Sequence, residues 1–128
     1  MAKYTDEEKY KFIEEFKAKT QDFAIQILEY CDTLPYNKNS TRIISNQLGR
    51  SCSSTAANYR AACRARSGRE FYAKINITDE EADETVFWLE MIKKGNFDVD
   101  KTNLDGYLKT ANEILGVVSK AKYNSKNQ

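Results

Sequence analysis

A single proline, Pro35, interrupts this chain of 128 residues, and only five glycines accompany it. Proline and glycine are the strongest breakers of regular structure, so their scarcity leaves room for long helices and little room for a turn-rich β fold. The length suits one domain with one core, and 41% hydrophobic and 30% charged residues are a normal globular balance. We therefore expect residues 1–128 to form one all-α domain.

Apolar residues recur at the three-to-four spacing of an amphipathic helix in four segments, about residues 5–33, 40–66, 68–94 and 102–120. Thr5 and Glu8 form a capping box at the first segment, and Ser67 and Glu70 form a second one at the third segment. Residues 123–128 are predicted to be a frayed tail. Because the connections are short, consecutive helices should be antiparallel, in an up-down four-helix bundle.

Each segment has a main apolar stripe that is predicted to face the core. In chain order its members are Phe12, Ile13, Phe16, Phe23, Ala24, Ile27, Leu28, Leu34, then Ile44, Leu48, Cys52, Thr55, Tyr59, Ala62, Cys63, then Phe71, Ile75, Ala82, Thr85, Val86, Leu89, Ile92, and finally Leu104, Leu108, Ala111, Leu115 and Val118. The third segment also has a second apolar set, more than 100° away around the helix: Ile77, Trp88 and Met91. A helix of a monomeric bundle needs only one stripe, so we expect the second set, with Glu80 and Glu84, to form a subunit interface.

The absence of histidine restricts the chemistry that this chain can perform. It excludes Ser-His-Asp and Cys-His nucleophiles and histidine metal sites. Cys31, Cys52 and Cys63 form no C-x-x-C pair, so we interpret them as buried thiols. We predict no catalytic residue, metal, cofactor or small-molecule substrate, and keep an enzyme with a carboxylate or lysine site at a subunit junction as a remote alternative. The chain has no apolar run long enough for a membrane span, and its first ten residues are too polar for a signal peptide, so we expect a cytoplasmic protein.

Charge is segregated along the sequence, although the net charge is only +1. All six arginines lie between Arg42 and Arg69, and no acidic residue occurs from Thr33 to Arg69. Arg42, Arg50, Arg60 and Arg64 share one arc of the second helix, opposite its core arc. They could bind phosphates of a nucleic acid, or they could pair with carboxylates of a neighbouring helix or subunit. Both interpretations stay open.

Several motifs stand in order in the second and third segments: Gln47-Leu48-Gly49-Arg50-Ser51, Ala56-Ala57-Asn58-Tyr59-Arg60-Ala61-Ala62, Lys74-Ile75-Asn76-Ile77 and Trp88-Leu89-Glu90. Over about residues 21–94 the chain resembles the bacterial four helix bundle protein family, also called the 23S rRNA intervening-sequence or S23 family. The family's signature positions are occupied by Asn58, Tyr59, Arg60, Arg64, Arg66, Ser67 and Glu70.

The resemblance implies a four-helix bundle that assembles as a ring-shaped homopentamer. Its members are often encoded in inserts of 23S rRNA genes, their role is poorly defined, and the family has no catalytic motif to carry over. The accessory variability proteins of diversity-generating retroelements are similar in fold and bind nucleic acid through basic surfaces. Two functional hypotheses follow: a non-enzymatic homo-oligomer that serves as a scaffold or associates with RNA, and a module that binds RNA or a ribonucleoprotein through the arginine face of the second helix.

Overall fold

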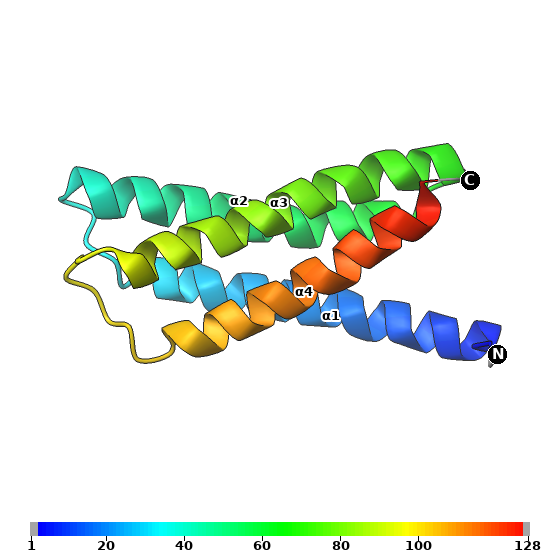
Figure 1. The fold of residues 1–128 in the computed structure, drawn as a ribbon, viewed down its shortest axis with the longest axis horizontal. Helices are drawn as coiled ribbons and strands as arrows, with labels where there is room; N and C mark the ends of the chain where they lie inside the picture. Colours follow the sequence, from blue (N-terminus) through cyan, green and yellow to red (C-terminus); the bar gives the residue numbers. More distant parts are fainter. Residues whose placement is uncertain (1–2, 127–128) are drawn as a thin grey trace.

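Four helices make up the computed structural model, which describes residues 3–126: α1 (Asp6–Cys31), α2 (Asn39–Cys63), α3 (Gly68–Lys94) and α4 (Leu104–Ser125). Consecutive helices are antiparallel and joined by short connections (Figure 1), and no strand occurs in the described part of the chain. The predicted all-α, up-down four-helix bundle is therefore confirmed. No helix of the described part is long and apolar enough to cross a membrane.

The starts of α1 and α3 follow the predicted capping residues, whereas the residues before α2 and α4, Lys38 and Asn103, make no side-chain cap hydrogen bond. At α1, Thr5 Oγ1 accepts the Glu8 amide at 3.1 Å, and Glu8 Oε1 accepts the Thr5 amide at 2.9 Å, which completes the capping box. At α3, Ser67 Oγ accepts the Glu70 amide at 3.1 Å. A complete capping box would also have the Glu70 carboxylate accept the Ser67 amide. It accepts the Arg66 amide instead, at 3.3 Å, and the second box differs from the prediction in this bond.

Two helix ends differ from the predicted bounds. Helix α2 ends at Cys63 and not near residue 66, because the residues that follow form the turn that leads to the Ser67 cap. Helix α4 continues to Ser125, so residues 123–125 are helical and not a frayed tail, while residues 127 and 128 lie outside the described range. The physical reason is contact with α3: Ser119 donates a hydrogen bond to Asp79, Lys122 Nζ lies 3.4 Å from the same carboxylate, and Ser125 is buried.

The core is built from all four helices, and most of the predicted stripe residues are buried in it. Its most completely enclosed apolar side chains are Ile27, Leu48, Ile75, Leu89, Ile92 and Val118. Two residues predicted to face the core are exposed: Phe12 is 53% accessible and Leu28 45% accessible. Ile114 is buried although the predicted stripe of its helix left it out.

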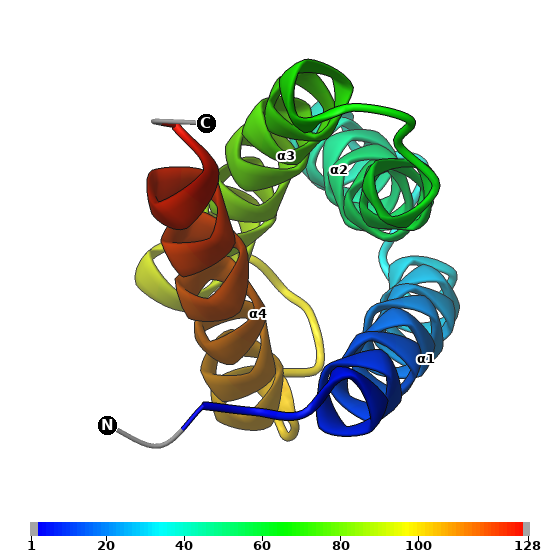
Figure 2. The same ribbon diagram turned by 90° about the vertical axis from the view of Figure 1, so that its right-hand side faces the viewer.

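Helix α1 is attached to the bundle on one side. It packs against α2, whereas α4 packs against α3 and contacts α1 little. Both views show the N-terminal half of α1 and the C-terminal half of α4 diverging from each other (Figures 1 and 2). This divergence explains the exposure of Phe12, because no neighbouring helix covers that side of α1.

Candidate interaction surfaces

The four arginines of the predicted arc on α2 have different environments. Arg42 is half-buried, and its Nη2 donates a hydrogen bond to Asn39 Oδ1 at 2.6 Å. Its guanidinium also lies over the Tyr36 ring, with Cζ 5.8 Å from the ring centroid, within the range of a cation–π contact. The side chain is therefore held at the end of the bundle that contains the α1–α2 connection.

Arg50 binds carboxylates of α3 in the same chain. Its Nη1 lies 3.1 Å from Glu81 Oε2, and its Nη2 lies 2.7 Å from Glu84 Oε2. The hydrogen bond from Arg50 lowers the pKa of Glu84, and the hydrogen bond from Glu84 raises the pKa of Arg50. Trp88 Nε1 donates to the other Glu84 oxygen at 3.2 Å. Arg50 thus joins α2 to α3, and its guanidinium would have to leave these carboxylates, at least in part, to bind another anion.

Arg60 and Arg64 lie in the C-terminal half of α2 and are exposed. Within residues 3–126, neither of them makes an ion pair, and the same holds for exposed Arg69 at the start of α3. Arg66 lies between Arg64 and Arg69 in the sequence, and its Nε is 3.4 Å from Glu70 Oε2. These four arginines, Arg60, Arg64, Arg66 and Arg69, are called the basic cluster below. Of the four arginines in the predicted arc, Arg42 and Arg50 therefore bind other groups of the chain. Arg60 and Arg64 belong to the basic cluster.

The outer face of α3 leaves large apolar side chains uncovered. Ile77 is 40% accessible, Met91 38% and Phe87 49%. We call Ile77, Phe87 and Met91 the α3 stripe. Sequence analysis missed Phe87, although its position four residues before Met91 places the two on one face. Of the other predicted interface residues, Glu80 is exposed, Glu84 is held by Arg50, and Trp88 is half-buried against the core.

A groove between α1 and α2 was not predicted at all. Its walls include Ile25, which is 50% accessible, and Leu28. Its floor is formed by small side chains of both helices, and it is lined by Ala18, Ala24, Ser53, Ala56 and Ala57 together with Glu14, Lys17, Gln21 and Arg60. The run of small residues in the second segment was an available signal, because small residues on α2 leave room above them.

The sequence model of the family described as "23S rRNA-intervening sequence protein" matches residues 3–120. The chain belongs to this family. It is also similar to a crystal structure of a protein of unknown function from the S23 ribosomal protein family of Bacteroides thetaiotaomicron VPI-5482, with 30% sequence identity and a TM-score of 0.71. That similarity covers 84% of this chain and 97% of the other. No curated protein matches the chain.

In this 23S rRNA-intervening sequence protein, several signature residues make contacts within α2, between α2 and α1, and at the start of α3. Asn58 Nδ2 donates to the Ser54 carbonyl at 2.9 Å, and the buried Tyr59 ring meets Phe16 edge-on with centroids 4.8 Å apart. Ser67 and Glu70 cap α3 as described above. The signature positions that present free side chains to solvent are Arg60 and Arg64.

The interior of the bundle offers little space for a ligand. A central cavity of about 10 Å³, close to the minimum for one water, is lined by residues such as Thr20, Thr55 and Thr85. The hydroxyls of Thr85 and Ser51 share a hydrogen bond of 3.1 Å between α3 and α2. Among residues 3–126, no group of three or more histidine, cysteine or acidic side chains is placed to hold a metal ion.

Proposed function

We propose that this protein is a non-enzymatic assembly protein whose copies associate through the α3 stripe. The exposure of Ile77, Phe87 and Met91 on one helix face is the observation that carries the proposal. Large apolar side chains exposed on one helix face are unfavourable in water and are typical of protein–protein contacts. A ring-shaped pentamer, which the family resemblance implies, stays a prediction for the form of the assembly, and so does the cytoplasmic location.

Light scattering coupled to size-exclusion chromatography tests this proposal. We expect the wild type to have the mass of several chains and Ile77→Glu/Met91→Glu to have the mass of one. Both replaced side chains are exposed, so the double variant should fold, which circular dichroism can check. Trp88 is a poorer target, because it packs against the core and its loss would also disturb the bundle.

Tyr123→Glu is a suitable control, since Tyr123 is an exposed aromatic residue that belongs to α4 and not to α3. We expect this variant to keep the wild-type mass. A wild type that stays monomeric at all concentrations would contradict the proposal. An assembly that survives the double substitution would show that other residues hold it together.

RNA association is a second candidate function, and the free arginines of the basic cluster favour it. Arg60, Arg64 and Arg69 are exposed and lack an ion partner within the described residues, so their guanidinium groups could bind phosphate oxygens without first breaking a contact. Affinity for the phosphate backbone would fall with salt, because binding releases counterions.

Fluorescence anisotropy of a labelled structured RNA, measured at two salt concentrations, tests the second candidate. The structure supplies a matched pair of variants with equal charge: Arg60→Ala/Arg64→Ala removes free arginines, and Arg42→Ala/Arg50→Ala removes engaged ones. We expect the first variant to bind more weakly and with a shallower salt dependence, while the second binds as the wild type does. Equal losses in both variants, or no binding at low salt, would contradict an RNA-binding role for the basic cluster.

A further inference from the structure

The bundle leaves two apolar surfaces uncovered, and they lie on different helices. One is the α3 stripe. The other is the groove between α1 and α2, where Ile25 and Leu28 are exposed above small side chains of α2. Viewed along the bundle axis, α1 and α3 occupy diagonally opposite corners (Figure 2). A contact that pairs two α3 stripes would leave the groove uncovered, so the second surface needs an explanation of its own.

The groove has the shape and surface of a site for a helix. Its two helices approach closely at Gly49, where an added Cβ would lie 3.2 Å from Leu28 Cδ2. Farther along α2 the floor consists of Ala56 and Ala57. The hydroxyl of Ser53, which also lines the groove, donates to the Gly49 carbonyl at 2.7 Å and is already satisfied. The floor therefore presents a shallow and largely apolar surface, on which larger apolar side chains can pack.

Length is compatible with the α3 stripe as the occupant. From Ile77 to Met91 the stripe extends about 21 Å at a rise of ~1.5 Å per residue. The α1 wall from Lys17 to Leu28 extends about 16 Å by the same measure. The stripe is therefore long enough to reach both ends of the groove, with Ile77 toward one end and Phe87 and Met91 toward the other.

Charge favours the same occupant. The exposed carboxylates beside the stripe belong to Glu80, Asp83 and Glu90. On the groove rim, Glu14 is paired with Lys17 at 2.6 Å, which leaves Arg60 as the unpaired charge. Arg60 is therefore complementary in charge to the carboxylates of α3, and complementary charges across an interface favour association in one register.

We infer that the α3 stripe of one copy packs into the α1–α2 groove of a second copy. The inference rests on the proposed self-association and specifies its geometry. Each copy then contributes one stripe and one groove, so the contact is heterologous. Such a contact repeats around a closed ring or along an open chain and does not stop at two copies. In this arrangement Arg60 approaches the acidic flank of the neighbouring α3.

Two variants with one damaged surface each distinguish this contact from a symmetric one. Ile77→Glu/Met91→Glu removes the stripe, and Ile25→Glu/Ala57→Glu places two carboxylates in the groove. All four positions are exposed, so both variants should fold. We expect each variant alone to be monomeric by light scattering and an equimolar mixture to form a species of two chains, because one intact stripe then meets one intact groove.

Crosslinking provides a readout that keeps the native surfaces almost intact. In a Cys63→Ser background, Phe87→Cys and Ile25→Cys are prepared separately and treated with a short bis-maleimide. We expect little product from either variant alone and a crosslinked pair from the mixture. Crosslinking of Phe87→Cys to itself, or normal assembly of the groove variant, would overturn the inference and leave self-association standing. A monomeric wild type would overturn both.

Discussion

Burial determines the reactivity of the three cysteines. Burial raises the pKa of Cys31 to about 11 and that of Cys52 to about 12. Cys63 is half-buried; burial raises its pKa as well, and the Tyr59 hydroxyl and Lys17 oppose this effect. Since the thiolate is the reactive form, Cys31 and Cys52 should be inert in the native protein near neutral pH. We expect a colourimetric thiol reagent to modify Cys63 first, and all three cysteines only after unfolding in guanidinium.

Cys63→Ser is the control for this prediction, and it should abolish the native reaction while leaving two thiols to react after unfolding. Rapid modification of all three cysteines without denaturant would show that the core opens much more often than its packing indicates. The sequence alone predicted burial for all three thiols, and the structure confirms it for Cys31 and Cys52.

At the scale of elements, the ion pairs of Arg50 connect α2 to α3. They should make the free energy of unfolding of the protein depend on pH. The Arg50 hydrogen bond lowers the pKa of Glu84 in the folded state. Stabilisation from this group is therefore present above the pKa of the unfolded chain and is lost as the pH falls through the folded value. We expect Glu84→Gln to lower the free energy of unfolding by up to ~1 kcal/mol at neutral pH, since the pair is partly exposed.

Urea unfolding at neutral pH and near pH 3 checks this prediction. The difference between wild type and Glu84→Gln should be present at the first pH and vanish at the second. Glutamine keeps an oxygen for the Trp88 indole, so the comparison isolates the charge. A difference that is the same at both pH values would mean that packing, and not the ion pair, causes it.

Helix α4 contains Gly116 at an exposed position where an added Cβ meets nothing within 4 Å. Glycine in a helix interior is less favourable than alanine by ~0.5–1 kcal/mol, so Gly116→Ala should raise the free energy of unfolding by about that amount. Urea denaturation measures it. Gly49→Ala is the contrasting variant, because its new Cβ would press on Leu28 at 3.2 Å, and we expect it to stabilise the protein less or not at all.

Helix number, order and core faces could be predicted from the sequence because the apolar period is local information. The exposure of Phe12 could not, since it depends on where α4 lies relative to α1, and that of Leu28 could not, since it depends on how α2 packs beside α1. The four arginines of the predicted arc look alike in sequence. Only the folded chain shows that Glu81 and Glu84, more than thirty residues away, bind Arg50 and that Arg60 has no such partner.

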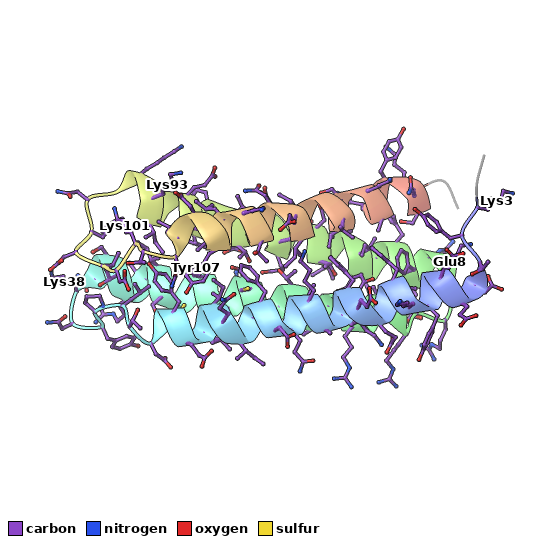
Figure 3. All side chains as sticks on the ribbon, turned by 90° about the horizontal axis from the view of Figure 1, so that it is seen from below. Lys3, Glu8, Lys38, Lys93, Lys101 and Tyr107 are labelled. Atoms are coloured by element: carbon purple, nitrogen blue, oxygen red, sulfur yellow. The ribbon has the colours of Figure 1, made fainter. Side chains whose placement is uncertain are left out.

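At the scale of the whole molecule, α1 meets the α3–α4 side of the bundle in a contact at one end, besides the Lys19–Glu113 pair near the middle. The buried Tyr30 donates its hydroxyl hydrogen to the Asp100 carbonyl at 2.8 Å, and its ring lies 5.1 Å from that of Tyr107, measured between centroids. Tyr107 lies beside the connection between α3 and α4, where Lys101 is also found (Figure 3). We expect Tyr30→Phe to lower the free energy of unfolding by ~1 kcal/mol, because it removes one hydrogen bond and keeps the ring.

Hydrogen exchange and alkaline titration together test the origin of this loss. Amides near residues 96–103 should exchange faster in Tyr30→Phe, with little change in α2 or α3. Burial, followed by the Asp100 charge, raises the pKa of Tyr30 to about 12, while an unfolded tyrosine titrates near ~10. A group whose pKa is raised by folding stabilises the protein fully below the unfolded value, so the advantage of wild type over Tyr30→Phe should shrink as the pH rises from ~10 toward about 12. Tyr107→Phe has no such hydrogen bond to lose within residues 3–126 and should show neither effect. If it reproduced both, the loss could not be assigned to the Tyr30 hydrogen bond, because Tyr107→Phe keeps that bond and both rings.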